Sequence, residues 1–343
     1  MQICYRKCYG KCYGKCCLFE YNLSLKGRES LMKEKVAIIL SVYNGEKYLK
    51  EQIDSLLNQS YRNIDIFIHD DGSEDESRSI ILQYSKEYDN IHYNAEKGGY
   101  GYPRCFISLL ECTSGYKYYA FCDQDDVWLP EKIELGLACL LKQNQDLPLL
   151  YYTAVEYCDS KLNHIRDSRF AEGKGKIERM YLQSMLFGGE AMGMTFMFND
   201  VARVALIEAN IANAWSFKDW FLKLYCASCG RVLYNPKPSA KYRRHNEAVT
   251  NSSNPAGKLN RYIGQIKDIF FSKNGFDNQK NIIDYMQKEK KDSILRENVM
   301  LIELFSKPNS LKKRMKKVFW KKRFRSKVLD EIGYRVAFLI GRI

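Results

Sequence analysis

The sequence YYAFCDQDDVWLP occupies residues 118–130 and runs from an apolar, aromatic-rich stretch straight into three carboxylates. The apolar part is typical of a buried strand, and Pro130 with the charged residues after it is typical of the first turn of a helix. Asp123 and Asp125 alternate, so on an extended strand both side chains point to one side and can bind a single cation. Carboxylate oxygens suit Mg2+ or Mn2+, which complete their coordination with water and phosphates. An isolated D-x-D also occurs in solvated acidic turns, but the surrounding sequence favours the metal site.

Strand-like and helix-like segments alternate ahead of this stretch. Residues 36–43, 64–69 and 91–94 are mostly apolar runs rich in β-branched side chains, as expected for parallel strands buried on both faces. The segments between them, 46–58, 74–88 and 103–113, carry helical spacing, and Ser73 with Glu76 is typical of a capping box. This order predicts an α/β fold with a doubly wound, mainly parallel sheet flanked by helices. Such sheets bind ligands beyond the carboxyl ends of their strands.

The residues at those carboxyl ends share a chemistry that suits a nucleoside diphosphate. They offer an aromatic face, a hydroxyl, carboxylates that can accept from an imide or a ribose, and a glycine loop that a ligand can approach closely. In strand order they are Ser41, Tyr43 and Asn44, then Asp70 and Asp71, then Gly98 and Gly99, and finally Asp123 and Asp125. The glycine loop lacks the G-x-G-x-x-G and G-x-x-x-x-G-K-[ST] arrangements, which argues against a dinucleotide site and a P-loop.

The positive charge is concentrated at the two ends of the chain. The 343 residues carry a net charge of +13, but residues 307–343 hold thirteen Lys or Arg and two acids, and residues 1–32 hold six and two. The remainder, residues 33–306, is close to neutral at −2. Because a nucleic-acid enzyme is expected to carry basic charge over its working face, no nucleic-acid partner is expected. The first 32 residues form a low-complexity Cys/Tyr/Lys extension, which we expect to be disordered or to precede the true start.

Four segments, in this order and spacing, resemble the family 2 inverting glycosyltransferases of the GT-A fold. They are residues 36–44, Gln59-Ser60-Tyr61, Asp70-Asp71-Gly72-Ser73 and Cys122-Asp123-Gln124-Asp125-Asp126-Val127-Trp128. The last is especially similar to bacterial rhamnosyltransferase-like enzymes of surface polysaccharide synthesis, and the resemblance covers about residues 35–250. It implies Asp125 as the more direct metal ligand, together with a nucleotide-sugar site formed by Ser41, Tyr43, Asn44, Glu46, Asp71, Gly98, Gly99, Arg104 and Asp123. Cys105 departs from the family, in which asparagine is usual.

The same resemblance implies roles for residues in the second half of this module. Asp219, at the head of a predicted helix, is similar to the general base that an inverting transfer needs to take the proton of the acceptor hydroxyl. The motif Tyr242-Arg243-Arg244-His245 implies a diphosphate contact by Arg243 and a metal contact by His245. Lys218 departs from the family, which more often has an acid or a histidine there. The alternatives are an exposed first-turn carboxylate for Asp219 and a basic surface loop around residue 243.

The C-terminal part has helical spacing over residues 256–306 and a strongly basic tail over residues 310–343. The tail interleaves Lys and Arg with aliphatic and aromatic side chains, as is typical of a helix that lies on an anionic membrane surface. Its longest apolar run is far below the 18 or more residues needed to cross a bilayer. RNA binding and a merely solvated helix are the alternatives. The resemblance also implies a lipid-linked saccharide acceptor, and hence a cytoplasmic enzyme attached peripherally to the inner face of the cell membrane.

These features predict three segments and one activity. The segments are the extension 1–32, a GT-A domain over 33–255 with a nucleotide-sugar half (33–130) and an acceptor half (131–255), and a helical extension over 256–343. The activity is inverting transfer, dependent on Mg2+ or Mn2+, from a UDP- or dTDP-sugar, dTDP-rhamnose included, to a hydroxyl of a lipid-linked cell-surface glycan. The alternatives are a nucleotidyltransferase, which should show a basic glycine-rich signature near its first strand, and a non-catalytic nucleotide-sugar-binding module, which would tolerate loss of Asp219.

Overall fold

The computed structural model describes residues 33–95, 98–168, 176–188, 191–209, 217–245, 276–325 and 328–343. The strands are β1 (Val36–Val42), β2 (Ile64–Asp70), β3 (Ile91–Asn94), β4 (Tyr118–Cys122), β5 (Val127–Trp128), β6 (Leu149–Cys158), β7 (His164–Asp167), β8 (Glu178–Met180), β9 (Met197–Asn199) and β10 (Arg231–Arg243). The α-helices are α2 (Leu49–Leu57), α3 (Ser77–Glu87), α4 (Arg104–Cys112), α5 (Lys132–Leu140), α6 (Leu182–Leu186), α7 (Asp200–Glu208), α8 (Phe217–Cys229), α10 (Asp277–Glu289), α11 (Val299–Phe305), α12 (Leu311–Val318) and α13 (Val328–Leu339), with short 3-10 turns η1 (Gly193–Thr195) and η3 (Lys291–Ser293). The predicted extension 1–32 and part of the predicted helical segment, residues 256–275, lie outside the described residues.

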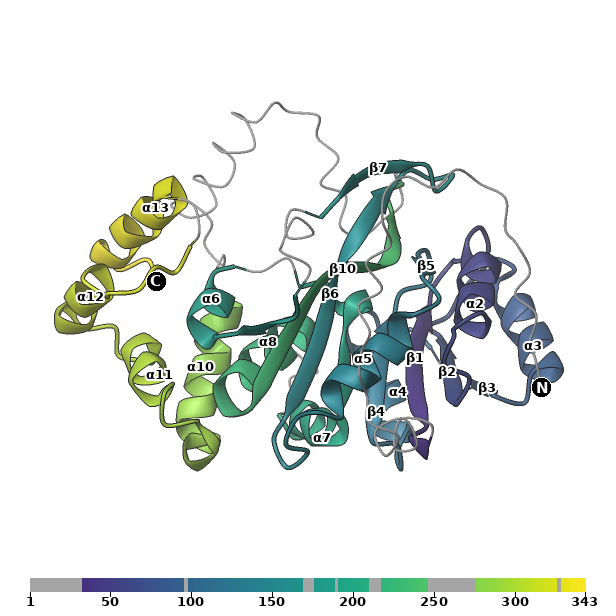
Figure 1. Cartoon of the computed structure of the whole chain (residues 1–343), viewed down its shortest axis with the longest axis horizontal. Helices are drawn as coiled ribbons and strands as arrows, with labels where there is room; N and C mark the ends of the chain where they lie inside the picture. The colour runs from purple at the N-terminus through teal and green to yellow at the C-terminus, as the bar shows by residue number, and fades with distance from the viewer. Residues whose placement is uncertain are drawn as a thin grey trace, which may run out of the picture.

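The described strands form one ten-stranded sheet in the order β3-β2-β1-β4-β9-β6-β10-β5, with β7 beside β6 and β8 beside β10 (Figure 1). Strands β3, β2, β1 and β4 run parallel to one another. β9 is antiparallel to both β4 and β6, while β10 runs parallel to β6 and antiparallel to β5. The sheet is therefore mainly parallel, and the predicted doubly wound α/β architecture is confirmed.

β1 shows why these segments form central strands. Each residue from Val36 to Leu40 is 0% exposed, because successive side chains enter two different cores on the two faces of the sheet. Ala37 and Ile39 join the cluster that packs against α4, α6, α7, α8 and the C-terminal helices. Ile38 and its alternate neighbours join the other cluster, which packs against α2, α3 and α5. Helices on both faces are what a parallel sheet of this composition requires.

The predicted capping box at the start of α3 is wrong. α3 begins at Ser77 rather than near residue 74, and the residue at its N-cap position, Glu76, makes no side-chain capping hydrogen bond. The Ser73 hydroxyl instead accepts a hydrogen bond from the amide of Asn44 at 2.9 Å. The segment before the helix is held by the loop after β1, since the Glu46 carboxylate accepts the amide of Glu76 at 3.0 Å.

The strand-based reason given for the position of the two aspartates is also wrong. β4 ends at Cys122, so Asp123 and Asp125 lie in the turn that follows rather than on the strand. Alternation along a strand therefore does not set the directions of their side chains. Their positions depend on contacts with other elements, described below.

The C-terminal helices pack onto the body and lie at the opposite end of the molecule from β3 (Figure 1). Phe187, just after α6, contacts Phe305, Phe324, Tyr334 and Phe338 with ring centroids 5.0 to 5.6 Å apart. The predicted basic helical tail is thus two helices, α12 and α13, joined to the core by an aromatic cluster. Among the described residues, no helix is both long and apolar enough to cross a membrane.

Candidate functional site

The carboxyl ends of the central parallel strands share one edge of the sheet. The register pairs Val42 of β1 with Asp70 of β2, and Leu40 of β1 with Cys122 of β4. The polar residues that follow these strands therefore lie at the same edge, as the alternation of strands and helices predicts.

Gln124 joins the loop after β1 to the acidic turn after β4. Its side-chain oxygen accepts the amide of Tyr43 at 2.7 Å, and its side-chain nitrogen donates to the carbonyl of Tyr43 at 2.9 Å. Gly45 makes room for this contact, because a Cβ there would lie 2.7 Å from Gln124 Oε1. The backbone of Tyr43 is fixed in this way, while its ring remains 56% exposed and can lie against the base of a ligand.

Asn44 and Glu46 hold the loop after β2. The side-chain oxygen of Asn44 accepts the amide of Glu74 at 2.9 Å, and the amide of Glu46 donates to the Asp75 carboxylate at 2.9 Å. The Glu46 side chain accepts the amide of Glu76, so both side chains contact the 73–76 segment. These two residues join the loops of β1 and β2, and their predicted contact with a nucleotide sugar stays a prediction.

The carboxylate of Asp71 organises the glycine loop after β3. Oδ1 accepts the amides of Gly99 and Tyr100 at 2.9 and 2.8 Å, and Oδ2 accepts the amide of Gly101 at 2.8 Å. Gly98 cannot carry a side chain, because a Cβ there would lie 2.4 Å from the backbone carbonyl carbon of Asp71. Three amide donors leave one lone pair of Oδ2 to accept from a ligand.

Beneath this loop lies a buried histidine that sequence reasoning did not single out. His69 is 0% exposed, and its ring nitrogens make no hydrogen bond with any described residue, although Nε2 lies 3.5 Å from Asp71 Oδ1. The ring of Tyr100 stacks on the imidazole with centroids 5.5 Å apart. Nothing in the sequence marks His69, since it ends a buried strand like any other residue of that run.

Ser41 lies near the end of β1, next in space to Cys105 in the first turn of α4, which Arg104 begins. Burial raises the pKa of the Cys105 thiol, and a hydrogen bond with Ser41 opposes that rise. Cys105 therefore contacts Ser41 at the position where asparagine was expected. Arg104 is the first residue of α4 and is partly exposed at this edge.

The acidic turn combines three carboxylates of different burial. Burial raises the pKa of Asp123 to about 6, against the opposing charge of Lys218 and with further upward contributions from Asp125 and Asp219. Asp126 is 0% exposed, and burial, reinforced by Asp125 and Asp123, holds the pKa of its carboxyl well above the usual range. Carboxylates that raise one another's pKa in this way favour a bound cation.

His245, after β10, reaches this turn from the second half of the chain. Its Nε2 lies 2.8 Å from Oδ2 of Asp125, and its ring packs against Tyr48 with centroids 4.9 Å apart. His245 Nδ1 and Asp126 Oδ2 are buried and have no hydrogen-bond partner among the residues that the structure describes. The structure therefore brings together two of the three residues predicted to bind a metal.

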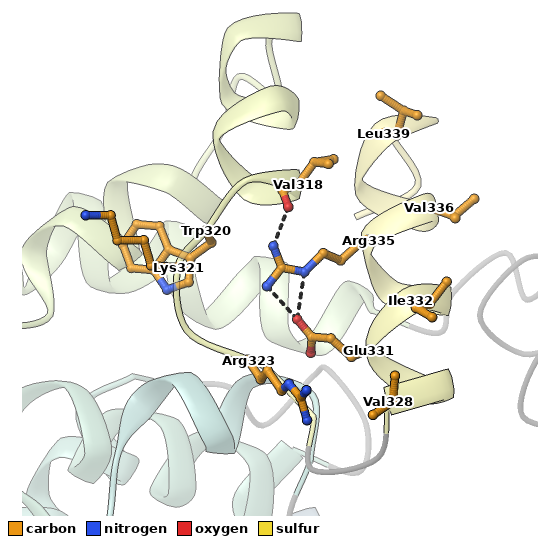
Figure 2. A pocket seen from close by; sticks show the side chains of 10 residues that line it. All are labelled: Val318, Trp320, Lys321, Arg323, Val328, Glu331, Ile332, Arg335, Val336 and Leu339. Carbon is orange, nitrogen blue, oxygen red and sulfur yellow. Dashed lines mark hydrogen bonds and ion pairs between the residues drawn. The ribbon is translucent and has the colours of Figure 1, made fainter.

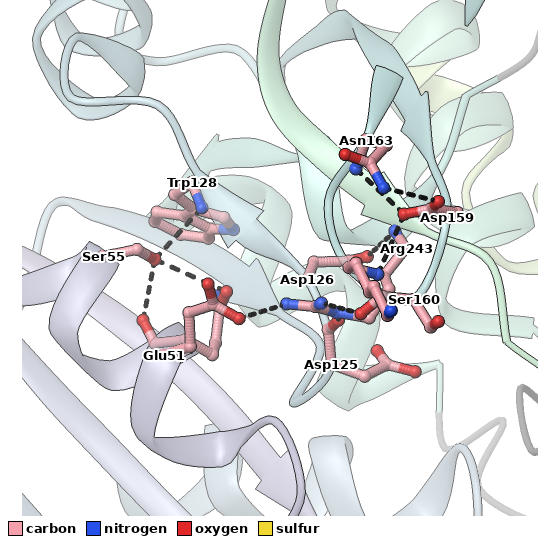
Figure 3. Close-up of polar contacts among 11 residues, drawn as sticks. Glu51, Ser55, Asp125, Asp126, Trp128, Asp159, Ser160, Asn163 and Arg243 are labelled. Carbon is pink, nitrogen blue, oxygen red and sulfur yellow. Dashed lines mark hydrogen bonds and ion pairs between the residues drawn. The ribbon is translucent and has the colours of Figure 1, made fainter. Parts of the chain in front are cut away.

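Arg243 clamps the acidic turn from the same side (Figure 3). Its Nε donates to the carbonyl of Asp125 at 2.8 Å, its Nη1 to the carbonyl of Ser160 at 2.6 Å, and its Nη2 to the carboxylate of Glu51 at 2.5 Å. Its amide donates to Asp126 at 2.9 Å, and the residue is 2% exposed. These bonds use three of the five guanidinium N–H donors and give Arg243 a positioning role in the acidic turn, while its predicted diphosphate contact stays a prediction.

Asp219 lies in the first turn of α8 and is held at both carboxylate oxygens. Oδ1 accepts from Lys218 Nζ at 3.0 Å, and Oδ2 accepts from the amide of Gly193 at 3.1 Å. A Cβ on Gly193 would lie 2.4 Å from Asp219 Oδ1, so only glycine permits this approach. The Asp219 side chain is 25% exposed, and each oxygen keeps a lone pair that can take a proton.

Lys218 is a buried cation, not the exposed first-turn lysine that its sequence position suggests. Its side chain is 1% exposed and its Nζ lies 4.2 and 4.4 Å from the ring centroids of Phe106 and Phe121. Burial alone would lower the pKa of Lys218, but Asp219, Tyr102 and Asp123 together raise it. The lysine is therefore charged and placed between the acidic turn and Asp219.

Within the described parts of the chain, no three His, Cys, Asp or Glu side chains converge on one metal position. Asp125 and His245 form a pair of suitable donors beside a partnerless Asp126 oxygen. This set fits Mg2+ or Mn2+, which are commonly held by one or two protein ligands and by substrate phosphates and water.

Comparison with known proteins places this site in a family. Residues 37–202 match the model of "Glycosyl transferase family 2". An uncharacterized glycosyltransferase of Rickettsia prowazekii is 30% identical over 236 residues, which cover 66% of this chain and 69% of that protein. The chain belongs to glycosyl transferase family 2.

Two relatives carry more specific names. The family 2 glycosyltransferase is 26% identical over 220 residues to "dTDP-rhamnosyl transferase RfbG" of Shigella flexneri, covering 60% of this chain and 71% of that one. It is 33% identical over 109 residues to "UDP-Glc:alpha-D-GlcNAc-diphosphoundecaprenol beta-1,3-glucosyltransferase WfgD" of Escherichia coli, covering 32% of this chain and 42% of that one.

Among solved structures, the glycosyltransferase resembles S. aureus TarS 1-349 in complex with UDP. The TM-score is 0.50 at 16% identity, and the match covers 90% of this chain and 91% of TarS 1-349. At this identity the likeness concerns the fold, which is the GT-A type with a mainly parallel sheet flanked by helices.

Proposed function

We propose that this family 2 glycosyltransferase transfers a sugar, with inversion, from a UDP- or dTDP-sugar to a hydroxyl of a lipid-linked cell-surface glycan. One observation carries the proposal: the Asp125–His245 pair and the carboxylate of Asp71 lie at the same edge of the sheet. The relatives named for dTDP-rhamnosyl transfer and for a diphosphoundecaprenol acceptor support the donor and acceptor classes, dTDP-rhamnose included.

The donor lies along the ends of β1, β2 and β4. The free lone pair of Asp71 accepts the imide N–H of a uracil or thymine base, and the exposed ring of Tyr43 lies against the base. The glycine loop at Gly98 and Gly99 lets the nucleotide approach the backbone, and Ser41 and Arg104 complete this part of the site. Asp123 then faces the ribose from the acidic turn.

Asp125 and His245 would hold Mg2+ or Mn2+, with Asp123 next to them. When bound, the metal neutralises negative charge on the diphosphate leaving group. The protein's own part is to hold these donors in place. Arg243 fixes the backbone of Asp125, and Gln124 fixes the turn against the loop of β1.

Asp219 takes the proton of the acceptor hydroxyl as that oxygen attacks the anomeric carbon from the face opposite the diphosphate. Its two hydrogen bonds fix the direction of the carboxylate, and its partial exposure leaves it open to the acceptor. In this proposal the residues that contact the base and ribose lie within 33–130, the base Asp219 lies within 131–255, and His245 of the second half completes the metal site.

A lipid-linked acceptor would place the enzyme on the inner face of the cell membrane, as a peripheral protein that contacts the bilayer through residues 310–343. Support comes from the acceptor named for the WfgD relative and from the basic charge of this segment. Family membership favours glycosyl transfer over the nucleotidyltransferase alternative. The non-catalytic alternative is addressed by the following experiment.

The test measures nucleotide release from UDP-, dTDP- and GDP-sugars with Mn2+, Mg2+ or EDTA. The full-length chain is compared with Asp125→Ala, Asp219→Asn and the exposed control Asp146→Ala. We expect metal-dependent release from one donor class, at least about 100-fold lower in Asp125→Ala, because charge stabilisation at the leaving group is a dominant catalytic contribution. Asp219→Asn should bind the nucleotide as wild type does and lose transfer.

Two results would contradict the proposal. Full transfer by Asp219→Asn would remove the base assignment, and equal activity in EDTA would remove the metal site at Asp125. Nucleotide binding without release, with every acceptor fraction tried, would favour the non-catalytic binding module.

A further inference from the structure

The outer face of α13 is apolar and uncovered by any described residue. Its inner face packs into the core through Tyr334, Ala337 and Phe338, which are at most 8% exposed. The opposite face carries a second apolar row at helical spacing, 42 to 54% exposed, called here the outer stripe: Val328, Ile332, Val336 and Leu339. Figure 2 shows Ile332 and Val336 on the side of α13 away from Arg335, which donates to the carbonyl of Val318. A helix with apolar side chains on two opposite faces normally has both faces covered, so the outer stripe calls for a covering surface.

The helix α12 also carries exposed apolar side chains. Leu311 and Met315 lie one helical turn apart and are 68 and 38% exposed, and Phe319, just beyond the helix, is 73% exposed. Between α12 and α13 lies an open groove of about 480 Å³, lined across from the outer stripe by Trp320, Lys321 and Arg323 (Figure 2). The groove joins Val318, at the end of α12, to the outer stripe of α13.

The exposed charge around this surface is positive. Residues 307–343 hold thirteen Lys or Arg and two acids, Asp330 and Glu331. Both acids are in ion pairs, Asp330 with Arg325 and Glu331 with Arg335. The basic side chains are largely exposed, including Lys312, Lys316, Lys321, Lys322 and Arg323. Exposed apolar side chains surrounded by cationic ones complement a layer that has an apolar interior and an anionic surface.

We propose that the α12–α13 surface docks onto an anionic phospholipid bilayer, with the outer stripe in the interface and the surrounding lysines at the lipid phosphates. The exposed lysines argue against a protein partner, because lysine is depleted at protein–protein interfaces. The aliphatic stripe argues against a nucleic acid, which offers no apolar surface of this kind. The inference names the contacting face and does not depend on the donor or on the metal.

The docked face has a fixed relation to the acceptor side of the enzyme. Trp320 Nε1 donates to the side chain of Gln183 at 3.2 Å, and Gln183 Nε2 donates to the carbonyl of Arg323 at 2.7 Å. Arg325 donates to the carbonyl of Phe187, just after α6. The same chain segment continues to Gly193, which holds Asp219. Membrane docking would therefore orient the acceptor side and not merely concentrate the enzyme.

The test is co-sedimentation of the full-length chain with vesicles of phosphatidylcholine, with and without phosphatidylglycerol. We expect binding to the anionic vesicles only, and weaker binding at high salt. Ile332→Gln with Val336→Gln should lower the partition coefficient about 100-fold, since burial of two aliphatic side chains is lost. Lys321→Gln with Lys322→Gln should lower it about 25-fold, about fivefold for each charge.

Val201→Gln with Val204→Gln is the matched control, because these valines of α7 are also exposed, at 38% each, and lie outside the docking face. The control pair should bind vesicles as wild type does. Because all substituted side chains are exposed, each variant should keep the wild-type melting temperature. Equal vesicle binding by the Ile332/Val336 pair, or no binding by the wild type, would overturn the proposal. A concentration-dependent dimer that the Ile332/Val336 pair abolishes would overturn it too, because a second copy would then cover the stripe.

Discussion

Lys218→Met tests whether the buried cation at the start of α8 positions the proposed base. Methionine keeps the length of the side chain and suits the rings of Phe106 and Phe121, so the substitution removes the charge with little change of volume. What is lost is the 3.0 Å charge-assisted hydrogen bond to Oδ1 of Asp219, which leaves the carboxylate held only by Gly193. The carboxylate can then rotate away from the acceptor.

The structure sets the expected size of the effect on stability. A hydrogen bond to a charged group contributes about 1.5 to 3 kcal/mol when fully formed in the interior. Asp219 is 25% exposed, so water compensates part of the loss, and removal of a buried ammonium recovers its desolvation cost. We therefore expect the free energy of unfolding to fall by about 1 kcal/mol or less.

The effect on transfer should be larger than the effect on stability. Misplacement of a reacting group by about 1 Å costs on the order of 100-fold in rate, so we expect kcat to fall 10- to 100-fold. The donor KM should change by a smaller factor than kcat, because Lys218 acts on Asp123 only through its charge and hydrogen-bonds Asp219 directly. Lys218→Arg, which keeps the charge, should recover part of the lost kcat.

The assay is steady-state transfer with the donor found by nucleotide release, normalised to the stoichiometry of nucleotide binding so that inactive protein is not counted. Lys223→Met is the control, because Lys223 is a buried lysine of the same helix that donates to the Gly188 carbonyl at 3.4 Å rather than to Asp219. An unchanged kcat in Lys218→Met, together with an inactive Asp219→Asn, would refute the positioning argument. An equal loss in Lys223→Met would point to a general effect of buried charge on α8.

Three further predictions concern other parts of the site. Gly98→Ala should weaken nucleotide binding by at least about tenfold, because the added Cβ meets the Asp71 backbone and displaces the loop. Calorimetric titration with UDP and dTDP measures the affinity, and an unchanged value would contradict the role of the loop. Arg243→Gln should weaken Mn2+-dependent nucleotide binding and lower the free energy of unfolding by about 3 kcal/mol, because the bonds to Asp125 and Glu51 are lost. A loss of stability with unchanged Mn2+-dependent binding would limit Arg243 to a structural role. Burial lowers the pKa of Lys223 from 10.5 in the unfolded chain to about 7. The unfolded state therefore binds more protons between these values, and the free energy of unfolding should rise as the pH goes from about 7 towards 10.5. Urea unfolding across this range should show a smaller rise for Lys223→Met.

The parallel half of the fold could be predicted because its signals are local. Runs such as Val36–Leu40 are apolar at every position, which indicates a strand buried on both faces, and the turns between them place polar residues at one edge. From that placement the convergence of Asp71 and the acidic turn follows without any knowledge of side-chain contacts. The strand order beyond β4 was not predictable in the same way, because β9 is a three-residue strand that pairs antiparallel with both of its neighbours.

The contacts of the site could not be predicted, because they join residues far apart in the sequence. Asn44 and Glu46 were predicted to bind the donor, yet their side chains hold the loop after β2 some 30 residues further along. Arginine often binds phosphate, and only the structure shows that the guanidinium of Arg243 is buried, at 2% exposure, and bonded to Glu51 and Ser160. Lys218 has the sequence position of a solvated helix residue, and no pattern indicates that it is buried.

The acidic turn is therefore a product of both halves of the chain. Its carboxylates come from the first half of the domain, where burial and mutual repulsion raise the pKa values of Asp123 and Asp126. Two buried cations from the second half oppose this rise, Lys218 from α8 and Arg243 from β10. Because each cation also holds an acceptor-side element, a change in the charge of the turn acts on both halves at once. The binding of a divalent cation and a nucleotide diphosphate at this turn should for that reason also influence the position of Asp219.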